Sequence, residues 1–150
     1  MKLKKIFALS DIAVTLSSSM AFANVEESTL ENQGRAIGAG TDHTFTTELP
    51  NNYQNNWFKF RTKETNNKDV RFRMTSKPSK CSGMTVWVEN SNKVRITNIY
   101  TNLGTLNYTY KLLINDAGSA MKGKSVRLGF EDADKTTISK HTVKGIVNYQ

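Results

Sequence analysis

Apolar and polar side chains alternate along short segments of the chain from Asp42 onward. In residues 69–75, for example, Val70, Phe72 and Met74 alternate with charged or polar neighbours. A period of two places every second side chain on one face of a β-strand, whereas a helix repeats about every 3.6 residues. Residues of the types Asn, Asp, Gly and Pro separate the segments and supply turn conformations that strands exclude. The alternation therefore predicts an all-β domain whose strands bury one face.

The expected strands are residues 43–49, 56–62, 69–75, 84–89, 93–99, 106–114, 124–130 and 141–149, with residues 101–104 among the turns. Short strands at this spacing, without a convincing helical pattern, are typical of a sandwich or barrel. We expect an antiparallel Greek-key β-sandwich of about seven to eight strands. The alternation places the following residues in its interior: Phe58, Phe60, Val70, Phe72, Met74, Met84, Val86, Val88, Val94, Ile96, Tyr108, Tyr110, Leu112, Ile114, Val126, Leu128, Phe130, Val143, Val147 and Tyr149.

The first residues have the three regions of an export signal. A lysine-rich start precedes a mostly apolar stretch, residues 6–16, and a small-residue region that ends in Ala21-Phe22-Ala23. The apolar stretch is too short to span a bilayer, which takes about 20 residues. We expect a helical signal peptide at 1–23, a flexible lead-in at 24–41 and the β-sandwich domain at 42–150. The alternative is a basic amphipathic N-terminal helix that is not cleaved. With cleavage, the protein is secreted and extracellular, with the cell wall as a place where it can be retained.

Basic side chains dominate the outward positions of the expected strands, and the whole chain has a formal net charge of +8 at pH 7. Outward tryptophans beside these cations suit stacking on sugar rings or contact with a lipid interface. The candidate ligand-binding residues are Trp57, Lys59, Arg61, Arg71, Arg73, Trp87, Arg95, Lys111 and Arg127. They predict a non-enzymatic binding module for an anionic wall polymer, lipid surface or glycan of the cell envelope, without a specific nucleic-acid target. The alternative is that the cations only keep the sheet soluble and block edge pairing, while each indole packs against a loop or a neighbouring strand.

Catalytic and metal-binding motifs are not evident in the sequence. His43, His141 and Cys81 are the candidates for a Cys–His pair, but Cys81 lies in a Ser/Lys/Pro loop without a nucleophile motif. Two histidines and one cysteine leave little for a zinc site. The acidic segment 131–134 lacks the glycine and the distal glutamate of an EF-hand loop, so we interpret it as a solvated turn. We therefore predict no catalytic residue, no metal and no cofactor. With a single cysteine, a disulfide can form only between two chains. Neither this disulfide nor the oligomeric state follows from the sequence.

Four short motifs carry a resemblance to a known group of proteins. They are Asn56-Trp57, Val86-Trp87-Val88-Glu89-Asn90-Ser91-Asn92, Gly123-Lys124-Ser125-Val126-Arg127-Leu128 and Val143-Lys144-Gly145-Ile146-Val147. In this order they resemble a family of small exported proteins of Gram-positive bacteria that have no assigned activity, some of which occur near bacteriocin-type export systems. The resemblance implies an exported β-sandwich and carries over no functional residue. Small size, basic charge and export also support an alternative function, a secreted bacteriocin-like antagonist.

Overall fold

The computed structural model describes residues 36–52 and 54–150, so the expected signal peptide lies outside the described residues. These residues form nine strands: β1 (Asp42–Leu49), β2 (Asn56–Trp57), β3 (Arg61–Thr62), β4 (Asp69–Ser76), β5 (Met84–Asn90), β6 (Tyr100–Leu103), β7 (Thr109–Leu113), β8 (Ser125–Asp132) and β9 (His141–Asn148). The described residues contain no helix, which confirms the prediction of an all-β domain. Among the same residues, no helix is long and apolar enough to cross a membrane.

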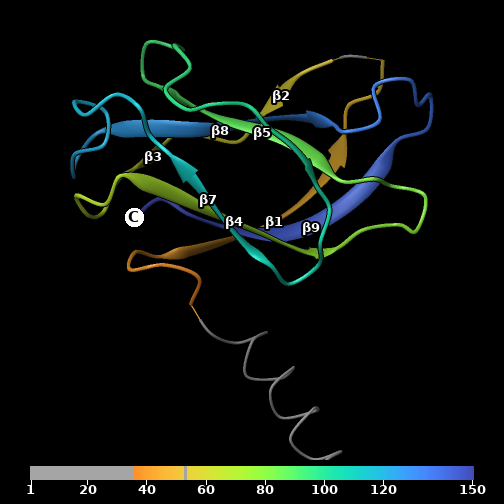
Figure 1. Cartoon of the computed structure of the whole chain (residues 1–150), viewed down its shortest axis with the longest axis horizontal. Coiled ribbons are helices and arrows are strands. Elements are labelled where there is room, and N and C mark those ends of the chain that lie inside the picture. Colours follow the sequence, from red (N-terminus) through yellow and green to blue (C-terminus); the bar gives the residue numbers. More distant parts are fainter. Residues whose placement is uncertain (1–35, 53) are drawn as a thin grey trace, which may run out of the picture. The chain divides into compact units, whose positions relative to one another are not determined.

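The strands form two antiparallel sheets, as Figure 1 shows. The four-stranded sheet has the order β1-β9-β4-β7. The five-stranded sheet has the order β2-β8-β5-β6, and β3 also pairs with β8. In Figure 1, β5 and β8 lie in one layer, and β1, β4 and β9 lie in the other. The hydrophobic core draws residues from both sheets, so the arrangement is consistent with a β-sandwich.

The long strands bury the face that the alternation assigns to the interior. On β4, Val70, Phe72 and Met74 have no solvent exposure, and the same is true of Val86 and Val88 on β5. The corresponding residues of β8 and β9 also belong to the core cluster. Each such side chain contributes about 1.5–3 kcal/mol relative to an exposed position, so these four strands determine where the two sheets meet.

The prediction of a strand at residues 93–99 is wrong, and the strand of this region is β6, where we expected a turn. The Asn90 side chain accepts hydrogen bonds from the backbone N–H groups of Asn92 and Val94, which closes a turn directly after β5. Lys93 has a φ of 62°, a left-handed conformation that interrupts a strand. Val94 consequently points into solvent rather than into the core.

The expected strand at 56–62 divides into β2 and β3, and its alternation breaks between them. Phe58 packs inward, with its ring centroid 4.8 Å from that of Phe45 and 4.6 Å from that of Phe130. Phe60, which we expected in the core, is instead exposed. The strand expected at 106–114 likewise begins only at Thr109, so Tyr108 is exposed rather than buried.

Residues 36–41, the end of the expected lead-in, are bound to the domain by hydrogen bonds. The Arg71 side chain donates to the Ile37 carbonyl oxygen over 2.9 Å, and the Ile37 side chain is buried. Gln150 Oε1 accepts from the Ala39 N–H, and Asn148 Nδ2 donates to the Gly40 carbonyl oxygen. This segment therefore occupies part of the surface beside the start of β4.

Candidate functional site

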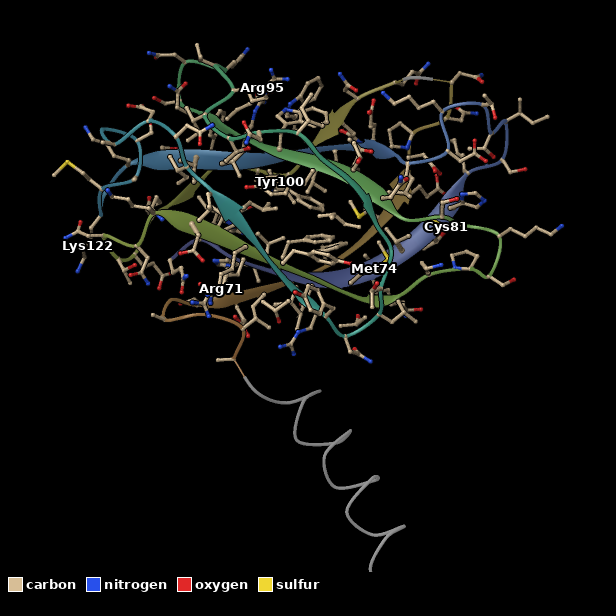
Figure 2. All side chains as sticks on the ribbon, viewed as in Figure 1. Arg71, Met74, Cys81, Arg95, Tyr100 and Lys122 are labelled. Carbon is tan, nitrogen blue, oxygen red and sulfur yellow. The ribbon has the colours of Figure 1, made fainter. Side chains whose placement is uncertain are left out.

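The predicted site residues are divided between two outer faces and an open edge of the molecule. On the four-stranded sheet, Arg71 of β4 lies opposite Lys111 of β7. On the five-stranded sheet, Trp87 of β5 lies opposite Gly129 of β8, and Glu89 lies opposite Arg127. In Figure 2, Arg71 and Arg95 accordingly lie on opposite outer sides of the two sheets. The nine predicted residues therefore do not make one continuous surface.

The arginines of β4 are used within the fold. Arg71 pairs with Asp69 over 3.1 Å and also holds the Ile37 carbonyl. Arg73 is 7% exposed, and its Nε and Nη2 atoms donate to Thr109 Oγ1 over 2.9 and 2.7 Å. Because these guanidinium groups already have partners, the four-stranded sheet offers mainly Lys111 and Lys144 to an outside ligand.

Lys59 and Arg61 lie at an open edge of the sandwich. Both are exposed, and Arg61 lies opposite Val126, on the inward-facing side of the five-stranded sheet rather than on its outer face. They line a hollow of about 150 Å³ together with residues of β1 that include Phe45. The alternation predicted an outward-facing Arg61 because it assumed one continuous strand, whereas the strand is interrupted between β2 and β3.

The outer face of the five-stranded sheet is organised around the Glu89 carboxylate. Its Oε1 atom accepts hydrogen bonds from the indole N–H groups of Trp57 and Trp87, each over 2.9 Å. Its Oε2 atom accepts from Nε and Nη2 of Arg127 over 2.9 and 2.6 Å. Burial raises the pKa of Glu89, but the hydrogen bonds from these three side chains outweigh it and hold the pKa below its ordinary value. Glu89 therefore stays ionised and fixes two indoles and a guanidinium.

The two tryptophans have different environments although both face outward. Trp87 is buried, and its indole packs against Gly129, where a Cβ atom would come within 2.4 Å of Trp87 Cε2. Trp57 is 40% exposed. The Arg127 guanidinium lies 4.9 Å from the ring centroid of Trp57 and the same distance from that of Phe60. Trp57 therefore presents an aromatic surface whose orientation is fixed.

A hollow of about 330 Å³ borders this aromatic surface. Its lining residues are Asn55, Trp57, Trp87, Glu89, Lys93, Arg95, Ile99, Glu131 and Lys135. Lys135 is paired with Glu131 over 3.0 Å, whereas Lys93 and Arg95 are exposed on the turn after β5. We name the surface made by Trp57, Phe60, Lys93, Arg95 and Arg127 the aromatic–cation face. It combines a flat apolar ring with positive charge, which suits a ligand that carries both sugar rings and acidic groups.

The structure also brings Asp132 together with Cys81 and His141, two of the candidates for a Cys–His pair. Cys81, Asp132 and His141 each offer a possible metal-ligand atom, and these atoms lie within 4.8 Å of one another. The interpretation of segment 131–134 as a solvated turn is wrong for Asp132, because β8 continues to this residue and its side chain is buried. His141 is buried at the start of β9. Cys81 lies in a loop, where alternation gives no direction, and the convergence was therefore missed.

The chain has no match in the comparisons with known proteins, whether with protein-family models, curated proteins or solved structures.

Proposed function

We propose that the protein is an exported, non-enzymatic binding module for an acidic sugar polymer of the cell envelope, which it binds with the aromatic–cation face. The observation that carries the proposal is the exposed Trp57 ring, held by Glu89 and Arg127 next to Lys93 and Arg95. The expected signal peptide supports a location at which such polymers occur.

The chemistry of the face favours an acidic glycan over a plain polyanion. An indole ring packs against the apolar face of a sugar, and a side chain fixed before binding loses little conformational entropy. Carboxylate or phosphate groups along the polymer would pair with the Lys93 and Arg95 side chains. Exposed pairs of this kind contribute about 0.2–1 kcal/mol each, so affinity depends on several contacts acting together.

The test compares two double variants that remove the same charge from different faces. Lys93→Ala with Arg95→Ala alters the aromatic–cation face, whereas Lys111→Ala with Lys144→Ala alters the four-stranded sheet. Binding of the purified protein to an acidic polysaccharide is measured by calorimetry, with a neutral polysaccharide and anionic lipid vesicles as parallel ligands. We expect the first variant to lose roughly fivefold to tenfold in affinity and the second less than twofold.

Equal losses in the two variants would show that only net charge matters and would contradict the proposed face. Binding to vesicles but not to polysaccharide would show that the partner is a lipid surface rather than a sugar polymer. Clearing of a bacterial lawn by the purified protein would favour the antagonist function instead.

A further inference from the structure

Three buried side chains converge on the inner side of the five-stranded sheet. Asp132 ends β8, His141 begins β9, and Cys81 lies in the loop between β4 and β5. Each residue is less than a tenth exposed. In Figure 2, Cys81 lies at the end of the sandwich where this loop approaches β9. The trio therefore links both sheets and a loop at one point of the fold.

The backbone and the hydrogen bonds around the trio hold its members in place. The Cys81 N–H donates to the Pro78 carbonyl oxygen over 3.0 Å, and Lys77 Nζ donates to the Cys81 carbonyl oxygen over 2.5 Å. Asp132 Oδ1 accepts from the Asp134 N–H over 2.8 Å, while Oδ2 lies 2.8 Å from His141 Nδ1. Among the described residues, the one hydrogen-bonding contact of Cys81 Sγ is a long one, 3.8 Å, to the Gly83 carbonyl oxygen. The sulfur is therefore the least engaged of the three donor groups.

We propose that Cys81, Asp132 and His141 bind one divalent cation of the Zn²⁺ type, with a water molecule as the fourth ligand. A thiolate, an imidazole and a carboxylate are the donors that zinc takes in proteins. The thiolate and the carboxylate together neutralise the two charges of the ion, so the buried complex carries no net charge.

The geometry requires only a small adjustment of the side chains. Zinc bonds of about 2.3 Å to sulfur and 2.0–2.1 Å to nitrogen or oxygen place tetrahedral ligand atoms about 3.3–3.6 Å apart. The present separations run from 2.8 Å for the Asp132–His141 pair to at most 4.8 Å. Shifts of about 1 Å therefore bring the three atoms to ligand distances, with the Asp132–His141 hydrogen bond exchanged for two bonds to the ion. The Asp134 N–H remains to orient the Asp132 carboxylate.

The test titrates the purified full chain, without a histidine tag, with Co²⁺ and then with Zn²⁺. One equivalent of Co²⁺ should give the visible ligand-field bands of a tetrahedral ion together with a thiolate-to-cobalt charge-transfer band, and Zn²⁺ should displace it. Cys81→Ser, Asp132→Asn and His141→Ala should each weaken Zn²⁺ binding by at least about 100-fold. The matched controls, His43→Ala and Asp134→Asn, keep the three ligands and should change it less than tenfold.

A second measurement does not depend on the folding of any variant. X-ray absorption at the zinc edge of the loaded wild-type protein should show one sulfur ligand at about 2.3 Å and nitrogen or oxygen ligands at about 2.0–2.1 Å. A spectrum without sulfur, or binding that His43→Ala abolishes, would show an adventitious surface ion and overturn the proposal. Failure to bind one equivalent of either metal would leave the trio as a hydrogen-bonded network and overturn it as well.

Discussion

Glu89 is the residue on which the aromatic–cation face depends. It lies on β5, while its three donors lie on β2, β5 and β8, so one carboxylate joins three strands. Strand β2 has only two residues, Asn56 and Trp57, and among the described strands it pairs with β8 alone. The bond from Trp57 to Glu89 therefore adds a side-chain link where the ladder itself is short.

The first prediction concerns the substitution Glu89→Gln. The amide cannot accept four hydrogen bonds as a carboxylate does, and the Arg127 charge loses its partner. We expect a loss of about 1.5–3 kcal/mol in the free energy of unfolding, measured by urea titration. Quenching of tryptophan fluorescence by acrylamide should increase as Trp57 is released. Glu48→Gln is the control, because Glu48 pairs with Lys140 where both side chains are more than half exposed, and it should be nearly neutral.

The second prediction is the pH dependence of this effect. The pKa of Glu89 in the folded protein lies below the ordinary value of 4.5. Its contribution to stability is therefore fully present above about pH 4.5 and is lost as the pH falls through the lower, folded-state pKa. The difference in unfolding free energy between wild type and Glu89→Gln should be constant near neutral pH and shrink in acid. A difference that persists unchanged in acid would mean that the Glu89 charge plays no part.

Strand β8 shows how a glycine within an element serves the site. The side of β8 that faces outward has Gly129 between Arg127 and Glu131, and the Trp87 indole from β5 fills the place of the missing side chain. Aromatic cover of a strand glycine stabilises the register of the pair. The same packing positions the Trp87 indole N–H, which donates a hydrogen bond to Glu89.

The third prediction is that Gly129→Ala destabilises the protein by about 1–3 kcal/mol, because the new methyl group meets the Trp87 ring at 2.4 Å. The melting temperature and the tryptophan emission maximum measure the effect, and displacement of Trp87 into water should shift the emission to the red. Gly118→Ala is the control, since its Cβ would meet nothing closer than 3.5 Å. If both variants have the same stability, Trp87 does not depend on this close approach.

The sequence was informative where an element is long and buried on one face. The alternation of β4, β5, β8 and β9 placed Phe72, Val86, Leu128 and Val143 inside, because a slip of one residue would expose a whole row of apolar side chains. The shorter β6 carries only one buried residue, Leu103, so its pattern could not be distinguished from a turn.

The candidate site was predictable only in part, for a related reason. The alternation correctly gave the outward direction of Trp57 and Trp87. It did not show that the Trp87 ring packs against Gly129 and is therefore buried. It gave no reason to single out Glu89, because two of its three donors, Trp57 and Arg127, come from other strands. The meeting of Cys81 with His141 depends on a loop conformation, to which no periodicity applies.

The molecule as a whole separates the cations of the aromatic–cation face from Lys111 and Lys144 on the four-stranded sheet. Interactions between charges are screened beyond about 8 Å at physiological ionic strength. A polymer bound to the aromatic–cation face therefore interacts electrostatically with Lys93 and Arg95, and only weakly with the cations of the four-stranded sheet. Two kinds of contact remain at this face: ionic contacts, which salt weakens, and ring contacts, which it leaves largely unchanged.

The last prediction separates these two contributions by ionic strength. Raising the salt concentration from about 0.1 to 1 M shortens the screening length from about 10 to 3 Å, so the Lys93→Ala/Arg95→Ala variant should approach the wild-type affinity for acidic polysaccharide. Trp57→Ala should instead cost roughly fivefold to tenfold at both concentrations, because it removes stacking worth about 1 kcal/mol. Trp57→Phe keeps a ring but cannot donate to Glu89, so it should recover part of the affinity. If the cost of Trp57→Ala vanished at high salt, the ring would act only through the charge of Arg127, and the ligand would need no sugar face at all.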